Sequence, residues 1–131
     1  MKRTAVNPWS WSLQYGYNQG EIVEGHTRTL FCSGQTALDA NVHPQHAGDI
    51  RAQTAFALDN LVAVLQEAEM TLANVVRLKI YTTDIDAMLK NYDVLVSRLD
   101  AAGVKPAQTL LGVARLAQPE LLVELEATAV A

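Results

Sequence analysis

Two segments near the C-terminus read Lys105-Pro-Ala-Gln-Thr-Leu-Leu-Gly-Val-Ala-Arg-Leu116 and Leu122-Val-Glu-Leu-Glu-Ala-Thr-Ala-Val130. The second alternates with a period of two residues, which is typical of a β-strand with one buried face. Its apolar face carries Val123, Leu125, Ala127 and Ala129, and its other face carries Leu122, Glu124, Glu126 and Thr128. We therefore predict a strand over residues 121–130 that presents two carboxylates on one face.

Further strands lie upstream of this one. Residues 108–114 are largely apolar on both faces, as expected for a strand that is buried on both sides. Residues 75–82 alternate, and they place Arg77 and Lys79 on the face that lacks Val76, Leu78 and Ile80. We expect these two cations to share a sheet face with Glu124 and Glu126.

Earlier still, the pattern predicts a β-hairpin that follows an irregular, aromatic start. Residues 21–24 form its first strand, Gly25 permits the turn, and residues 29–33 form a second strand that closes at Gly34.

Two one-sided helices complete the pattern. In residues 49–69 the apolar positions recur at three- and four-residue spacing, at Ala55, Leu58, Leu61, Val62, Leu65 and Ala68. A second helix begins after a cap at Asp84 or Asp86 and ends at Gly103, which Pro106 follows. Its apolar stripe is Met88, Tyr92, Leu95, Val96 and Leu99.

The element order β-β-α-β-α-β-β predicts an α+β fold in which a single sheet carries both helices on one face. The other face of the sheet is then uncovered in one chain. A small domain buries such a face by association, so we predict a closed cyclic oligomer with ligand clefts between its subunits.

Composition bounds the remaining possibilities. The 131 residues, half of them hydrophobic, suit one domain over residues 1–131. A net charge of −4 with scattered cations argues against nucleic acid as a partner. No segment is long and apolar enough to suggest a signal peptide or a membrane span, so we expect a cytoplasmic protein. Cys32 is expected to be a small buried residue rather than a nucleophile.

Several short motifs match one known family in the same order along the chain. They are Tyr17-Asn-Gln-Gly20, Ser33-Gly-Gln35, Ala52-Gln53, Leu58-Asp-Asn-Leu61, Asn91, Pro106-Ala107, Val113-Ala-Arg-Leu116 and Val123-Glu-Leu-Glu-Ala127. With them the chain resembles the reactive-intermediate deaminases (RidA), also known as the YjgF/UK114 or L-PSP endoribonuclease-like family. The resemblance implies a chorismate-mutase-like fold, a homotrimer with three interfacial sites, and hydrolysis of imines or enamines such as 2-aminoacrylate.

The resemblance also implies site residues. Tyr17, Ser33, Gly34, Asn91 and Glu124 match the family's site positions, while Leu110 replaces a commonly seen Cys. Gln108 stands where the family's deaminases carry an Arg that grips a substrate carboxylate, so we expect an altered substrate preference. We expect Gln108 beside the inter-subunit cleft, near the face that carries Glu124. We expect Glu124 to position or deprotonate a water at this cleft.

Other interpretations stay open. Glu124 and Glu126 can instead pair with Arg77, Lys79 or Arg115. Trp9, Trp11, Tyr15 and Tyr17 either attach the N-terminus to the fold or line a pocket for a less charged, larger ligand. His43, His46 and Asp49 make only a weak metal motif in a polar loop, and we expect neither a metal nor a cofactor.

Three functions are compatible with these features. The first is an imine-type hydrolase, and the second is a non-catalytic small-ligand-binding trimer. The third is an endoribonuclease or translation inhibitor, which the acidic charge disfavours.

Overall fold

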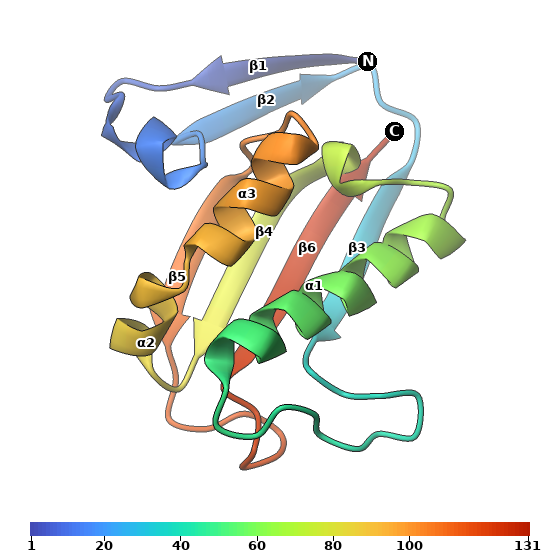
Figure 1. Cartoon of the computed structure of the whole chain (residues 1–131). Coiled ribbons are helices and arrows are strands. Elements are labelled where there is room, and N and C mark those ends of the chain that lie inside the picture. Colours follow the sequence, from blue (N-terminus) through green and yellow to red (C-terminus); the bar gives the residue numbers. More distant parts are fainter.

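The computed structural model describes residues 1–131 and contains two sheets (Figure 1). In chain order the elements are β1 (Lys2–Val6), a 3-10 helix η1 (Trp11–Tyr15), β2 (Gly20–Glu24), β3 (Thr29–Gln35), α1 (Ile50–Glu67), a 3-10 helix η2 (Leu72–Asn74), β4 (Val75–Thr82), α2 (Ile85–Lys90), α3 (Asp93–Ala101), β5 (Ala107–Gly112) and β6 (Val123–Val130). The main sheet has the order β3-β6-β4-β5, and within it only β4 and β5 are parallel.

Helices cover one face of the main sheet, as predicted. In Figure 1, α1 crosses β6 and β3, while α3 lies over β4 and β5. The Asp49 carboxylate accepts a hydrogen bond from the Ala52 backbone N–H (3.0 Å) and so caps α1. Leu58, Leu61 and Leu65 of α1 are fully buried against the sheet. None of the helices is both long and apolar enough to cross a membrane.

The other face of the main sheet has no helix over it. Lys79 lies opposite Glu126 in the β4–β6 register, and Tyr81 lies opposite Glu124. We call this side the open face. The alternation that we predicted for residues 75–82 is wrong at its first positions, because a register shift between Val75 and Arg77 buries Val75 fully and leaves Val76 half-buried.

The second predicted helix is in fact two helices. Asp84 caps α2 by accepting from the Ala87 N–H (3.0 Å). At the other end of α2, the Asn91 side chain donates to the Ala87 carbonyl (2.8 Å) and the Asn91 N–H donates to the Met88 carbonyl (3.1 Å). These bonds satisfy carbonyls that a continuing helix would use, so α2 ends there and α3 starts in a new direction.

The predicted hairpin and the single sheet are also corrected. β2 pairs with β1, antiparallel, in a separate two-stranded sheet, whereas β3 pairs with β6. The start of the chain, which we predicted to be irregular, supplies β1. This strand was missed because its five residues carry no apolar alternation, and its pairing depends on residues some twenty positions away.

A single side chain fastens the small sheet to the main one. The Arg3 guanidinium makes a bidentate contact with the Glu21 carboxylate, and it also donates to the Ala73 and Val75 carbonyls, the latter at 2.9 Å. The side chains are 20% and 7% exposed for Arg3 and Glu21. The clamp therefore joins β1, β2 and the start of β4 in a largely dry environment.

Candidate functional site

An aromatic pocket of about 390 Å³ lies between η1, the junction of α2 with α3, and β5. Its lining consists of Trp11, Tyr15, Tyr17, Leu89, Tyr92, Gln108 and Leu110. The rings of Trp11 and Tyr17 pack edge to face, with centroids 6.2 Å apart. Of the N-terminal aromatic residues, Trp9 does not line this pocket and is 62% exposed. The interpretation of the other three as a pocket wall therefore agrees with the structure.

The backbone at Gly16 explains how the N-terminal wall reaches the pocket. Gly16 ends η1 in a left-handed conformation (φ 82°), which glycine adopts at little cost. A Cβ at this position would also lie 3.3 Å from the methyl groups of Val96 in α3. The left-handed turn at Gly16 places Tyr15 and Tyr17 beside the cavity, one on either side of the glycine in the chain.

Gln108 is the one lining residue that is neither apolar nor aromatic. Its Nε2 donates to the Gly16 carbonyl (3.2 Å), and its Oε1 accepts from the Tyr92 hydroxyl. A carbonyl can only accept, so the amide nitrogen must face Gly16, and this fixes the orientation of the amide. Gln108 thereby connects β5 with η1 and α3.

Tyr92 stays protonated in this setting. Burial raises the pKa of Tyr92, and the neighbouring Tyr17 raises it further, so the phenol keeps its proton and donates a hydrogen bond to the Gln108 carbonyl oxygen over the whole physiological range. The sequence predicted Tyr92 only as part of an apolar helix stripe. Its role at the pocket was missed because the spacing of apolar residues identifies Tyr92 only by its apolar ring and says nothing of its hydroxyl.

Glu124 lies on the open face. Its neighbour Glu126 pairs with the Lys79 ammonium (3.4 Å) and accepts from the Tyr81 hydroxyl (3.1 Å), which confirms the salt-bridge interpretation for that residue. Glu124 makes no ion pair or side-chain hydrogen bond within the chain, and it packs against Gly34. Ser33, next to Gly34, is exposed.

The two halves of the predicted site lie on opposite faces of the sheet. Gln108 is opposite Leu78 in the β4–β5 register, and Leu78 belongs to the core beneath the helices. Glu124 is opposite Tyr81, on the open face. Residues paired across neighbouring strands share a face, so Gln108 and Glu124 of one chain are separated by the sheet itself. Asn91 does not line the aromatic pocket, and its side-chain amide donates to the Ala87 carbonyl.

A model of the family described as Endoribonuclease L-PSP matches residues 12–131. The chain belongs to this family. The resemblance to the RidA/YjgF/UK114 proteins is thereby confirmed, together with their α+β fold. Membership supports a small-molecule role, either deaminase-like or ligand-binding.

Relatives of this chain in the L-PSP family come from several different organisms. A RutC family protein of Pyrococcus abyssi is 32% identical over 100 residues, which is 76% of each chain. A RutC family protein of Synechocystis is 34% identical over 115 residues, 87% of this chain and 85% of the relative. Among solved structures, a Rid family protein of unknown function from Yersinia pestis is 36% identical with a TM-score of 0.86, and it covers 100% of both chains.

Other candidate residues of the L-PSP family chain have structural roles. His43 lies near Asp39 (Nδ1 to Oδ2, 3.7 Å), His46 packs against the Phe56 ring, and Asp49 caps α1. No group of three or more His, Cys, Asp or Glu side chains is arranged to hold a metal ion. Burial raises the pKa of the Cys32 thiol, in agreement with the buried role that we predicted.

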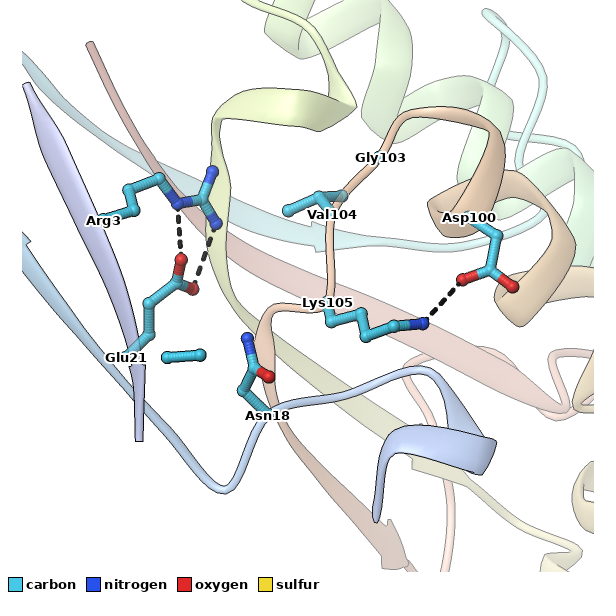
Figure 2. A pocket seen from close by; sticks show the side chains of 8 residues that line it. Arg3, Asn18, Glu21, Asp100, Gly103, Val104 and Lys105 are labelled. Carbon is cyan, nitrogen blue, oxygen red and sulfur yellow. Dashed lines mark hydrogen bonds and ion pairs between the residues drawn. The ribbon is translucent and has the colours of Figure 1, made fainter. Parts of the chain in front are cut away.

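A larger hollow, about 580 Å³, lies between the β1–β2 sheet and the end of α3 (Figure 2). Its charged side chains pair with one another, Arg3 with Glu21 and Lys105 with Asp100 (3.0 Å). Each of these charged side chains already has a partner, so the hollow offers no free charge to a ligand. We therefore regard it as the junction between the two sheets and not as a binding site.

Proposed function

We propose that this chain is a homotrimeric, single-domain enzyme that hydrolyses the C=N bond of an imine, an enamine or a related reactive metabolite. The sites lie between subunits, where the open face of one copy meets the aromatic pocket of the next. The separation of Gln108 and Glu124 by the sheet supports this arrangement, because only a second copy can bring both to one ligand. The open face also exposes apolar side chains, Phe31 at 79% and Leu111 at 49%, that association would bury.

Glu124 carries the proposal. It is a half-buried carboxylate without a partner on a face that no helix covers, which suits a group that binds water beside a substrate. In the proposed reaction Glu124 takes a proton from a water as the oxygen attacks the C=N carbon. That proton and then the proton of the newly formed hydroxyl group pass to the leaving nitrogen, so that one water and one imine become a carbonyl compound and ammonia. Tyr17 and Ser33 remain proposed contacts that orient the substrate, whereas the Asn91 amide already donates to the Ala87 carbonyl.

Structural neighbours support a small ligand. TdcF of E. coli shares this fold at a TM-score of 0.71 with 24% identity over 88% of this chain and 87% of its own, and it was solved with bound serine. We propose a ligand of comparable size here, with Gln108 in place of a cationic carboxylate-binding group. A cytoplasmic location stays a prediction, as a relative from Schizosaccharomyces pombe is described as mitochondrial.

Replacing Gln108 by Arg tests the substrate preference. A guanidinium can donate to both the Gly16 carbonyl and the Tyr92 oxygen, so the variant retains the local contacts and gains a charge. We expect hydrolysis of the carboxylate-bearing 2-iminopropionate to rise by a factor of about one hundred or more in kcat/KM, since such a buried charged pair is worth about 2–5 kcal/mol. The measurement is ammonia release from imine generated in situ.

Gln108→Met is the matched control, because it keeps the length of the side chain without hydrogen bonds or charge. It should show no gain. A folded, trimeric Gln108→Arg variant that remains inert toward every small imine would count against the enzyme and favour the ligand-binding alternative. That alternative is supported by the pocket lining, in which the only titratable side chains are tyrosines.

Replacing Gly34 by Ala tests the position of Glu124. A Cβ at Gly34 would collide with the Glu124 Oε1 and lie 2.7 Å from its Cδ. The obstructing group is the end of a flexible side chain, so we expect the carboxylate to swing away with little loss of stability, within about 1 kcal/mol. Imine hydrolysis should fall as far as it does on removal of the Glu124 charge. Urea denaturation together with the ammonia assay separates the two effects, and a variant that retains full activity would contradict the role of Glu124.

A further inference from the structure

The amide of Gln108 has unused hydrogen-bonding capacity inside the aromatic pocket. A glutamine amide offers two N–H donors and two carbonyl lone pairs. One donor is used by the Gly16 carbonyl and one lone pair by the Tyr92 hydroxyl. One donor and one acceptor therefore remain, on a group whose orientation its two partners fix.

Within one subunit the surroundings of this amide are uncharged. The other six lining residues are apolar or aromatic, and the pocket has no lysine, arginine, aspartate or glutamate. A carboxylate placed here would meet one N–H, one repelling carbonyl oxygen and no counter-charge from the same subunit, and it would lose its hydration. The carbonyl of a primary carboxamide can accept a hydrogen bond from the free N–H of Gln108, and its own N–H can donate to the free lone pair of Gln108. Such a group therefore satisfies both remaining hydrogen-bonding positions of the amide.

The size of the cavity limits the rest of the ligand. A volume of about 390 Å³ lies at the small end of the range for ligand pockets, which is about 300–1,000 Å³. The rings of Trp11, Tyr15, Tyr17 and Tyr92 offer flat apolar surfaces that stack on or against another ring. A single aromatic or similarly flat body with one polar group suits this space.

We infer that the Gln108 pocket recognises an uncharged carboxamide-type group, one that both donates and accepts hydrogen bonds, on a flat apolar body, and that it discriminates against a carboxylate. This inference rests on the proposed function, because it names the substrate class of the same site. Tyr92 is a positioning residue in this scheme. Its hydroxyl holds the Gln108 amide in the orientation in which it forms hydrogen bonds with the ligand.

Three probes of matched shape test the inference: benzamide, benzoate and acetophenone. They carry a donor and acceptor, a charged acceptor and a neutral acceptor on the same ring. Binding is measured by quenching of the tryptophan fluorescence to which Trp11 contributes, and checked by calorimetry, on the intact oligomer carrying Glu124→Gln so that catalysis plays no part. We expect benzamide to bind at least tenfold more tightly than benzoate, and also more tightly than acetophenone.

Two variants connect the preference to the named residues. Tyr92→Phe removes the hydroxyl that orients Gln108 and should bring the benzamide-to-benzoate ratio toward one. Trp9→Phe changes an exposed aromatic residue that does not line the pocket, and should leave the ratio as it is. Equal binding of benzamide and benzoate, or no saturable binding of benzamide up to its solubility, would overturn the inference.

Failure of the inference and failure of the proposed function give different results. A protein that hydrolyses imines but binds benzoate as tightly as benzamide retains the function and loses the inference. A protein that shows the amide preference but releases no ammonia from any imine retains the ligand class and is a binding protein instead.

Discussion

Glu124→Gln is expected to lower imine hydrolysis by a factor of about 10²–10⁴ in kcat, the usual contribution of a general acid–base group. The substitution keeps the size of the side chain and removes its ability to take a proton from water. Because Glu124 has no ion-pair partner in the chain, the change leaves no opposite charge behind within the subunit. The measurement is ammonia release under saturating imine, with KM determined in parallel.

Glu126→Gln is the matched control for this experiment. It removes a carboxylate from the same strand and the same face, but one that is already paired with Lys79 and Tyr81. It should change kcat little. If both variants lose activity equally, the charge of the open face matters and Glu124 has no special role. If neither loses activity, the proposed mechanism is wrong.

Arg3→Met is expected to reduce the free energy of unfolding by about 3–5 kcal/mol, the range found when one partner of a buried ion pair is removed. Glu21, with a side chain only 7% exposed, would lose its partner, and the Ala73 and Val75 carbonyls would lose their donor. Urea denaturation measures the loss. Hydrogen exchange at β2 shows whether the small sheet opens before the rest of the chain.

The double variant Arg3→Met/Glu21→Met tests the cause. If the unpaired Glu21 carboxylate is responsible, removing it as well should recover much of the lost stability, because an apolar pair can replace a buried ion pair at little cost. Lys2→Met provides the surface control, since Lys2 pairs with Glu24 in an exposed contact of 3.9 Å and should matter little. Additive losses from Arg3 and Glu21 would show that the two side chains do not act together.

Elements with one clear face could be predicted from the sequence. The stripe on α1 and the alternation of β6 each mark a single buried side, and the structure buries Leu58, Leu61, Leu125 and Ala127 accordingly. Predictions from the sequence were wrong where a strand pairs with residues far along the chain, or where the local pattern of apolar and polar residues was weak. β1 is a strand only because β2 pairs with it, and the second helix breaks because Asn91 binds the Ala87 carbonyl.

The candidate site divides in the same way. Its residue types were visible in the motifs, and Tyr17 and Gln108 do share a pocket, as Gly34 and Glu124 share a contact. The sequence did not show which of these two pairs lies on the helix-covered face of the sheet and which lies on the open face. Residues 108–114 are largely apolar on both faces, so their pattern does not say which face meets the helices. The burial on both sides that this pattern predicts is not found within one chain, where β5 is an edge strand and Leu111 is exposed.

The sequence by itself determined the α+β class, the family and the polar face of β6, because period and motif order are local properties of the chain. The tertiary structure alone decided that Gln108 points beneath the helices, that Glu124 points to the open face, and that Arg3 joins the two sheets. Alternation assigns side chains to two sides of a strand, but only the register between distant strands, such as Leu78 beside Gln108, decides which side is which.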